Sequence, residues 1–475
     1  MKNKLIHPMR ESFHDYLKDE SKLLGEAESI SFPESEAEIG KVLQLMRESR
    51  TPVTIQGGKT GIVGGAVPLR GHIMNLSHMK RVKSFSMGQD GEASLTVEPG
   101  VTLKDLRKAI QRLEAPKVFF WPPDPSELTA TVGGIAATNA KGICCRHYGN
   151  TASFIPGIRV MNAKGMVRDV KRGQNTLVVN GKPRDLLDVY LGSEGMFGAI
   201  TEITLRLLPK PLELWGIGFF FETADNGMSF ADKLNDMSFQ TRGAHIAAIE
   251  YLDPTTTINA LAAHHSPRVK SPHGAGTDAH RRAMVYVEIH GEQEKAIEKI
   301  AQTLMVDASK FNSDPDKTWA FSGETEIDRV KNFLYTADLT AISHIEKTRC
   351  VDSRITKLGL DFSLACNGLK TLVTRLENKL QKENLKACFR GHMGSSLHAD
   401  ILPESYEEFV KGKAFLETWA EKHPDSFGSA ITSYGIGKLK RSIFLKTLSP
   451  ACLSDIIQLK KQLDQERLWN PGNMI

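Results

Sequence analysis

A stretch rich in proline, glycine and alanine, from Phe119 to Gly149, constrains the fold of this chain more than any other. Its first part, Pro-Pro-Asp-Pro-Ser at residues 122–126, is a stiff turn, because proline fixes φ and removes a backbone donor. Gly133 and Gly134 then open a run of small residues, where a backbone can approach a ligand and direct N–H groups at it. The same small residues also suit tight packing, so this stretch alone leaves both interpretations open.

Two further glycine loops favour the ligand interpretation. Residues 53–55 indicate a strand that runs into Gly-Gly-Lys-Thr-Gly at 57–61, a loop suited to surround a pyrophosphate with N–H groups. Another loop, Gly-Ser-Glu-Gly at 192–195, precedes a strand at 202–208 in which apolar residues alternate. We therefore expect a long ligand held by several separated backbone loops.

These loops do not match the standard nucleotide motifs. Gly58-Lys59-Thr60 has the form of the end of a P-loop, but Val53 stands where that motif requires its first glycine. No G-x-G-x-x-G pattern follows an expected strand, so a Rossmann dinucleotide site is not supported.

The order of the motifs is itself informative. The chain resembles the FAD-binding domain of the vanillyl-alcohol oxidase / p-cresol methylhydroxylase flavoproteins, and especially the D-lactate, D-2-hydroxyglutarate and glycolate dehydrogenases. The motifs that carry the resemblance are Gln56–Gly61, Pro122–Ser126, Gly133-Gly134, Ala137–Ala140, Tyr148-Gly149 and Gly192–Gly195. It covers Ser31 to Pro211 and returns at 391–400 and 469–472.

The resemblance implies an α+β fold, in which a two-subdomain FAD-binding α/β unit precedes an α+β cap with an antiparallel sheet. We place the FAD-binding domain at 1–211, where Pro209-Lys-Pro211 marks a change in composition, the cap at 212–440, and a C-terminal segment at 441–475. Apolar periodicity in the cap predicts long helices over 296–304 and 369–380 on one face of the sheet.

FAD is the expected cofactor. Many relatives attach it covalently to a histidine in the first glycine loop, where this chain has Gly58-Lys59, so we expect non-covalent FAD. The loops should supply N–H groups to the pyrophosphate, and the resemblance places other residues near the remainder of the cofactor. The expected binding residues are Gly57, Gly58, Lys59, Thr60, Gly61, Pro123, Asp124, Ser126, Gly133, Gly134, Ala137, Thr138, Glu194, Gly195, Ile200 and Asn470.

The segment from Cys388 to Asp400 predicts a strand, a turn and a strand in the cap, with His392 and His398 on either side of the turn. Metal-dependent relatives have His-x6-His here, followed later by Glu-His. This chain has His-x5-His, with Ser433 and Tyr434 at the later pair, so an anionic ligand is missing and we expect no essential metal.

A metal-free site could instead use His398, His392, Tyr434 and Arg390. A histidine can take a hydroxyl proton while hydride leaves the carbon for a flavin, and a cation can hold the substrate carboxylate. Arg329 and Lys357 are further candidates for that cation, although each also suits a solvated surface. His398 equally suits a hydrogen-bonded strand position.

Composition sets the remaining limits. With 475 residues, 25% of them charged, and a net charge of +5, the chain reads as a globular protein without a nucleic-acid signature. We expect a cytoplasmic location, since the N-terminus lacks an apolar signal region, no membrane span appears, and the scattered cysteines suit a reducing compartment. The basic segment from His264 to Arg282 reads as a surface loop rather than a lid.

The expected function is an FAD-dependent dehydrogenase of a small 2-hydroxy acid such as D-lactate or glycolate. Its electrons would pass to an electron-transfer flavoprotein, an iron–sulfur subunit or a quinone system. Two alternatives stay open: a flavin-containing subunit of a larger complex without substrate chemistry of its own, and a non-redox FAD enzyme like the family's ether-lipid synthases.

Overall fold

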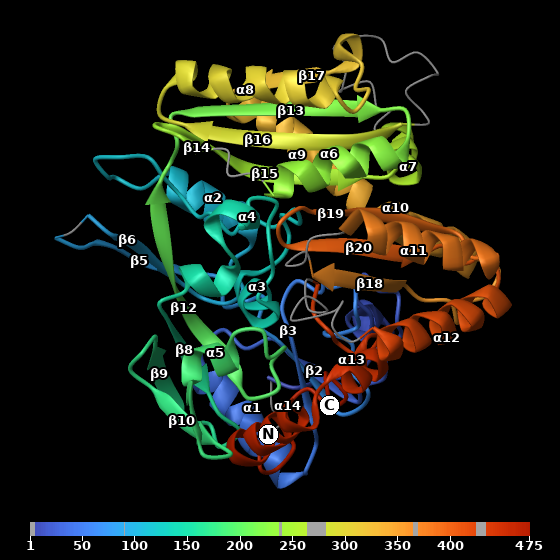
Figure 1. Ribbon diagram of the computed structural model, residues 1–475. Helices are drawn as coiled ribbons and strands as arrows, with labels where there is room; N and C mark the ends of the chain where they lie inside the picture. Colours follow the sequence, from blue (N-terminus) through green and yellow to red (C-terminus); the bar gives the residue numbers. More distant parts are fainter. Residues whose placement is uncertain (1–4, 90, 237–239, 264–281, 364–368, 424–433) are drawn as a thin grey trace.

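The structure, a computed structural model, describes residues 5–89, 91–236, 240–263, 282–363, 369–423 and 434–475. Two parts can be distinguished in Figure 1: the N-terminal half, which ends with strand β12 (Ala199–Pro209), and the cap, which begins with β13 (Glu213–Phe221). Of the expected basic segment His264–Arg282, all but Arg282 lies outside the described residues, as does Ser433.

The first sheet of the N-terminal half places the first glycine loop. Its strands run in the order β1-β2-β4-β3, and β3 and β4 are parallel. Ser35 caps helix α1 by accepting the Glu38 N–H, as the Ser-x-x-Glu pattern predicts. The elements are β1 (His7–Pro8), η1 (Glu11–Leu17), β2 (Ser29–Ser31), α1 (Glu36–Glu48), β3 (Val53–Gln56) and β4 (His72–Asn75).

A second, mainly antiparallel sheet carries the other two loops. The strand order of this sheet is β5-β6-β12-β8-β9. Thr102 caps the amphipathic helix α2 by accepting the Asp105 N–H. The Gly133-Gly134 run is the start of helix α3, which Thr131 caps. β7 also pairs with β12, whereas β10 and β11 form a separate two-stranded sheet. The elements of this region are β5 (Val82–Met87), β6 (Ala93–Val97), α2 (Leu103–Gln111), β7 (Phe119–Phe120), α3 (Val132–Thr138), α4 (Cys145–Tyr148), η2 (Thr151–Phe154), β8 (Gly157–Met161), β9 (Val167–Lys171), β10 (Thr176–Val179), β11 (Lys182–Asp185) and α5 (Leu186–Tyr190).

The cap is built on one large antiparallel sheet of order β17-β13-β16-β15-β19-β20-β18, with β14 paired to β15. The β19–β20 hairpin is the strand–turn–strand predicted around the two histidines. The strands are β14 (Gln240–Thr241), β15 (Ala244–Leu252), β16 (Ala283–Gly291), β17 (Trp319–Ser322), β18 (Leu358–Ser363), β19 (Ala387–His392) and β20 (Ser396–Ile401).

Helices cover both faces of this sheet, whereas the sequence predicted only one covered face. Val285 and Val287 of β16 pack in a core with α6, α8, α11 and α12, while Met284 and Tyr286 face α7 and α9. Because β16 is buried along its length, it begins with an unbroken run of apolar and aromatic residues, Ala283–Val287, before the buried polar residues Glu288 and His290. The helices are α6 (Ala224–Asp236), α7 (Pro254–Ala263), α8 (Glu294–Ser309), η4 (Pro315–Lys317), α9 (Glu324–Asp338), α10 (Thr340–Arg349), α11 (Leu369–Lys382) and α12 (Tyr406–Lys422).

The end of the chain leaves the cap and returns to the N-terminal half through α13 (Arg441–Thr447) and α14 (Pro450–Leu463) (Figure 1). Trp469, which is fully buried, bridges in parallel to Val53 at the start of β3. From this arrangement we propose three parts: an FAD-binding domain at 1–211, a cap at 212–440 and a C-terminal segment at 441–475.

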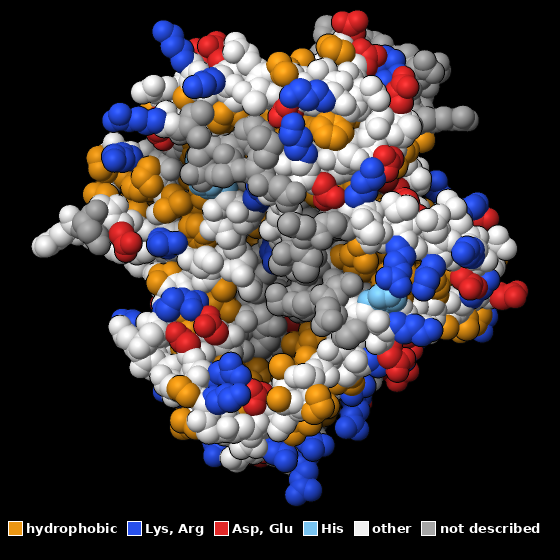
Figure 2. Space-filling model, in the orientation of Figure 1, with side chains coloured by type: hydrophobic (Ala, Val, Ile, Leu, Met, Phe, Trp, Pro, Cys, Tyr) orange, Lys and Arg blue, Asp and Glu red, His pale blue; other side chains and the backbone are white. Residues whose placement is uncertain are grey.

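Charged side chains are distributed rather than concentrated. On the face shown in Figure 2, the lysines and arginines of the described residues are spread over both parts and mixed with acidic groups. Within the described ranges, none of the helices combines the length and the apolar character that crossing a bilayer requires.

Candidate functional site

A cavity of about 460 Å³ lies between the N-terminal half and the cap. Its walls are the 57–61 loop after β3, the segment from Pro125 through α3, the 193–195 loop, and residues of the cap. Of the predicted cofactor residues, those that line it are Gly57, Gly58, Lys59, Thr60, Gly61, Ser126, Gly133, Gly134, Ala137, Thr138, Glu194, Gly195, Ile200 and Asn470.

Several of the glycines serve contacts between loops. A Cβ at Gly57 would stand 2.2 Å from the Thr131 hydroxyl oxygen, and one at Gly58 would stand 2.7 Å from the Thr129 carbonyl oxygen. At Gly133 a Cβ would meet Pro99 at 2.5 Å. The small residues therefore serve tight packing between the loops. This packing also brings the loops close enough to enclose one cavity.

Pro123 and Asp124 do not line this cavity, contrary to expectation. Pro123 is buried, and Asp124 forms an ion pair with Arg107 of α2, with Oδ1 2.9 Å from Nε and Oδ2 2.5 Å from Nη2. The stiff turn thus directs its carboxylate toward α2 and not toward the large cavity.

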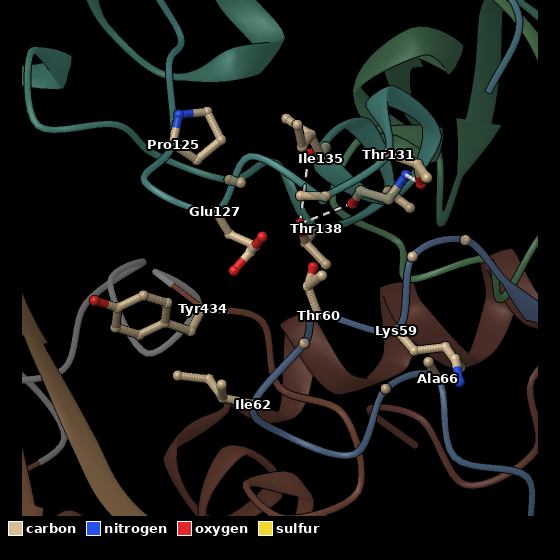
Figure 3. Close-up of a pocket in the computed structure, with 18 of the residues that line it drawn as sticks. Lys59, Thr60, Ile62, Ala66, Pro125, Glu127, Thr131, Ile135, Thr138 and Tyr434 are labelled. Carbon is tan, nitrogen blue, oxygen red and sulfur yellow. Dashed lines mark hydrogen bonds between the residues drawn. The ribbon is translucent and has the colours of Figure 1, made fainter. Parts of the chain in front are cut away.

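Lys59 lines the cavity but directs its ammonium elsewhere. The Nζ donates to the carbonyl oxygen of Asp15 at 2.8 Å and lies 4.2 Å from the centre of the Tyr16 ring. In Figure 3 its side chain extends away from Glu127 and Tyr434, which face the cavity. The ammonium of Lys59 therefore holds the N-terminal segment.

The C-terminal residue Asn470 joins two of the loops. Its Oδ1 accepts the Ile55 N–H at 2.7 Å, and its Nδ2 donates to the Glu194 carbonyl oxygen at 2.6 Å. The Glu194 carboxylate accepts the N–H groups of Ile436 at 2.5 Å and Gly437 at 2.8 Å. Burial raises the pKa of Glu194, although these donors favour its charged form.

The β19–β20 hairpin carries three of the four predicted catalytic residues, of which Arg390 and His392 line the cavity together with Tyr434, whereas His398 does not. Arg390 and His398 are cross-strand partners, and His398 is also in register with Asp361 of β18. The ring centres of His398 and Tyr434 are 4.4 Å apart, and those of His392 and His398 are 5.7 Å apart. The structure thus brings all four predicted residues together.

His398 is held at one nitrogen only. Its Nδ1 lies 2.7 Å from Asp361 Oδ1, while the buried Nε2 makes no hydrogen bond within the described part of the chain. Burial lowers the pKa of His398 to about 4, although Asp361 favours the charged form. The imidazole is therefore neutral at physiological pH.

Two buried carboxylates support the hairpin. Asp400 Oδ2 lies 2.5 Å from Arg390 Nη1, and its other oxygen contacts the ammonium of Lys357. Glu250 Oε1 lies 2.7 Å from His392 Nδ1. Lys357 is thus a structural partner of Asp400, and Arg329 forms an exposed ion pair with Glu326, so neither is placed to bind a substrate carboxylate.

A smaller cavity of about 120 Å³ adjoins the first one behind the hairpin. Arg390, His392 and Tyr335 line both cavities, and His398 lines the smaller one. Residues that the sequence did not single out complete it, namely Arg107, Glu250, Asp328, Lys331 and Asn332. Their helical or strand spacing resembles that of ordinary surface or core charges, so no sequence signal marked them.

A buried polar network joins the two parts beside this cavity. Cys144 lies 3.6 Å from Glu288 Oε1, whose other neighbours are His290 Nε2 at 2.7 Å and Lys331 Nζ at 3.3 Å. The sulfur, carboxylate and imidazole lie close enough to hold a metal ion. The Lys331 ammonium already supplies the positive charge there, and together with His290 it keeps the pKa of Glu288 low despite burial.

Comparison with known proteins agrees with this geometry. Residues 27–171 match the model of the FAD binding domain, and residues 218–474 match that of the C-terminal domain of FAD linked oxidases. The chain belongs to the FAD-linked oxidase family. It is therefore an FAD-linked oxidoreductase of the p-cresol methylhydroxylase type, as the motifs predicted.

Curated members of the family cover nearly the whole chain. The chain is 26% identical to a glycolate oxidase subunit GlcD of Bacillus subtilis, over 94% of this chain and 88% of that protein. It is also 26% identical to a D-lactate dehydrogenase of Anaerostipes hadrus, over 97% and 92%. Among solved structures, a 4-ethylphenol oxidase from Gulosibacter chungangensis shares the fold, with a TM-score of 0.71 and 15% identity over 99% and 94% of the chains.

Proposed function

We propose that this FAD-linked oxidase oxidises a small 2-hydroxy acid of the D-lactate or glycolate type and passes the electrons to a protein or quinone acceptor. The observation that carries the proposal is the Nε2 of His398, which has no hydrogen-bond partner among the described residues and belongs to a residue next to Arg390 at the wall of a small cavity beside the large one. The full-length relatives named as a glycolate oxidase subunit and a D-lactate dehydrogenase support the same substrate class.

The residues of the large cavity fit FAD as a non-covalent cofactor. The loops at 57–61 and 133–138 would hold it through backbone N–H groups, and the 194–195 loop with Asn470 would enclose it. When bound, FAD supplies the acceptor for the hydride that leaves the substrate carbon.

His398 is the proposed general base. Its neutral imidazole has an Nε2 lone pair that can take the proton of the substrate hydroxyl. The Asp361 carboxylate at Nδ1 fixes the tautomer and stabilises the imidazolium that forms. Arg390 would hold the substrate carboxylate, since this residue lines both cavities, and Tyr434 and His392 would orient the hydroxyl.

The volume of the smaller cavity, about 120 Å³, favours a short acid over a bulky one. Its wall also mixes charge of both signs, from Arg107, Asp124, Asp328 and Lys331. A polar acid with few carbon atoms suits such a wall better than an aromatic alcohol.

The decisive experiment is an anaerobic substrate screen of the purified yellow protein. D-lactate, L-lactate, glycolate and D-2-hydroxyglutarate are added in turn, and flavin absorbance is followed. We expect bleaching by D-lactate or glycolate, and slow reoxidation by air compared with a quinone analogue. If none of these acids reduces the flavin, the proposal fails, and a subunit without substrate chemistry becomes the better description.

A further inference from the structure

Lys440 stands behind His398, separated from it by one carboxylate. Asp361 places Oδ1 2.7 Å from His398 Nδ1 and Oδ2 2.5 Å from Lys440 Nζ. All three side chains are buried, with at most 5% of each residue exposed. Burial opposes ionisation of Asp361, but the Lys440 charge and the His398 contact outweigh it and hold its pKa well below the ordinary value.

Lys357 stands behind Arg390 in the same way. Asp400 Oδ2 lies 2.5 Å from Arg390 Nη1, and Oδ1 contacts Lys357 Nζ. Gly359 leaves room for this contact, because a Cβ there would lie 2.1 Å from Asp400 Oδ1 and 3.0 Å from Lys357 Nζ. The Lys–Asp pair therefore occupies space that any other residue at 359 would fill.

Both lysines come from outside the β19–β20 hairpin. Lys357 directly precedes β18, and Lys440 follows the turn whose N–H groups at Ile436 and Gly437 are bound by Glu194. A continuous series of contacts thus runs from the flavin-side residue Glu194, along 436–440, to Asp361 and His398. Asp361 and Asp400 each form contacts through both carboxylate oxygens, one to a lysine and one to His398 or Arg390. These contacts fix the orientation of His398 and Arg390.

We propose that Lys440 and Lys357 are positioning residues with separate tasks. Lys440 holds Asp361 against His398 and so serves proton removal, whereas Lys357 holds Asp400 against Arg390 and so serves capture of the substrate carboxylate. Neither lysine touches the substrate. The inference rests on the proposed function, because it assigns consequences to the base and to the carboxylate-binding guanidinium.

The test compares Lys440→Met and Lys357→Met as flavin-loaded proteins, by anaerobic flavin reduction with whichever of D-lactate or glycolate the wild type oxidises. For Lys440→Met we expect the limiting reduction rate to fall about 10- to 100-fold, the range for partners that orient a working histidine, with little change in the substrate concentration for half-maximal rate. For Lys357→Met we expect that concentration to rise by about the same factor, with a smaller change in limiting rate.

Conservative and control variants distinguish a loss of positioning of His398 or Arg390 from a general disruption of the fold. Lys440→Arg and Lys357→Arg keep the cation and should recover most of each loss. Lys386→Gln removes an exposed lysine next to the same hairpin, paired with Glu404, and should behave as wild type. Should either methionine variant fail to fold, the glutamine variant at that position takes its place, since it keeps a donor but no charge.

The outcomes are distinguishable. If the wild type reduces its flavin and Lys440→Met does so at the same limiting rate, the role of Lys440 is refuted while the proposed function stands. Equal effects of the two lysine variants on both kinetic parameters would also refute the separate tasks. If the wild type itself is not reduced by any acid, the proposed function fails.

Discussion

Asn470 Oδ1 accepts the Ile55 N–H at 2.7 Å, so one of the last residues of the chain fixes the strand that enters the first glycine loop. Asn470 itself has a left-handed backbone, with φ of 41°, and its Nδ2 donates to the Glu194 carbonyl oxygen at 2.6 Å. Two cofactor loops from distant parts of the sequence thus depend on a single side-chain amide.

Asn470→Ala should therefore lower both stability and FAD content. The substitution removes the acceptor of the Ile55 N–H and the nearer of two side-chain donors to the Glu194 carbonyl, which Asn473 Nδ2 also approaches at 3.4 Å, and a buried unsatisfied group costs about 1–3 kcal/mol. Thermal unfolding and the flavin-to-protein absorbance ratio measure the effect. Asn180→Ala is the control, since Asn180 also has a positive φ, of 47°, but bonds exposed groups. Equal behaviour of the two variants would contradict the role given to Asn470.

FAD should leave the protein intact when the polypeptide is denatured. The place where many relatives attach the flavin to histidine is Gly58-Lys59 here, and neither residue offers an imidazole. Acid precipitation followed by absorbance and mass measurement of the supernatant should recover the flavin as free FAD. Yellow colour retained in the precipitate would contradict this prediction.

Turnover should survive exhaustive chelation. A carboxylate on Nδ1 orients a histidine equally well as a base or as a metal ligand, so the outcome depends on the remaining ligands. The phenol of Tyr434 lies by the His398 ring, where metal-dependent relatives have the histidine of their Glu-His pair. Activity is measured after chelator treatment and dialysis, with metal content determined in parallel. Activity that is lost and then restored by zinc or manganese would show that a metal is essential.

His398→Ala should lose roughly 10²–10⁴-fold in the rate of flavin reduction, the usual contribution of general base catalysis. It should keep its FAD, because the cofactor loops belong to the N-terminal half. Tyr434→Phe should lose less, since an ordinary phenol, with a pKa of about 10, is a poor base near neutrality. Anaerobic flavin reduction measures both variants. A normal rate for His398→Ala with a slow Tyr434→Phe would reverse the two roles.

The stability of the protein should fall as the pH drops from about 6.5 toward 4, in part through His72. The two nitrogens of this buried ring form hydrogen bonds with the hydroxyls of Ser29 and Ser31, and burial lowers its pKa to about 4. Between these values the unfolded chain binds a proton that the folded chain does not, so stability decreases with falling pH by about 3 kcal/mol in total at this site. Above pH 6.5 both states are neutral and the contribution vanishes.

His72→Gln should make the unfolding midpoint less dependent on pH in this window. Thermal unfolding of the wild type and the variant is compared at several pH values from 4 to 7. His78→Gln is the control, because His78 is half-exposed. Parallel pH curves for wild type and His72→Gln would contradict the assignment.

The fold class and most of the proposed cofactor residues were predicted from the resemblance of ordered motifs to a flavoprotein family, and those motifs are themselves short loops and turns. Ser35 and Thr102 cap helices α1 and α2, and the 57–61 and 133–138 segments form loops or helix starts at one cavity. These features depend on φ preferences, side-chain caps and small residues, which act over a few neighbouring positions.

The sequence also predicted the β19–β20 hairpin, because His392 and His398 lie on either side of a turn between two expected strands. It did not predict the direction of every side chain. The Asp124 carboxylate pairs with Arg107, and the Lys59 ammonium donates to the Asp15 carbonyl oxygen. The low pKa of His398 results from burial, which local sequence patterns do not predict.

Only the tertiary structure decided which charges support the site. Asp361, Asp400, Lys357 and Lys440 lie far apart in the sequence or outside its motifs, and their pairing depends on the register of β18, β19 and β20. Likewise, helices cover the second face of the cap sheet because that face of β16 also carries buried Met284 and Tyr286. Caps and turns are set by neighbours in the chain, whereas buried ion pairs and covered faces are set by strand register and packing between distant segments, which a single sequence does not display.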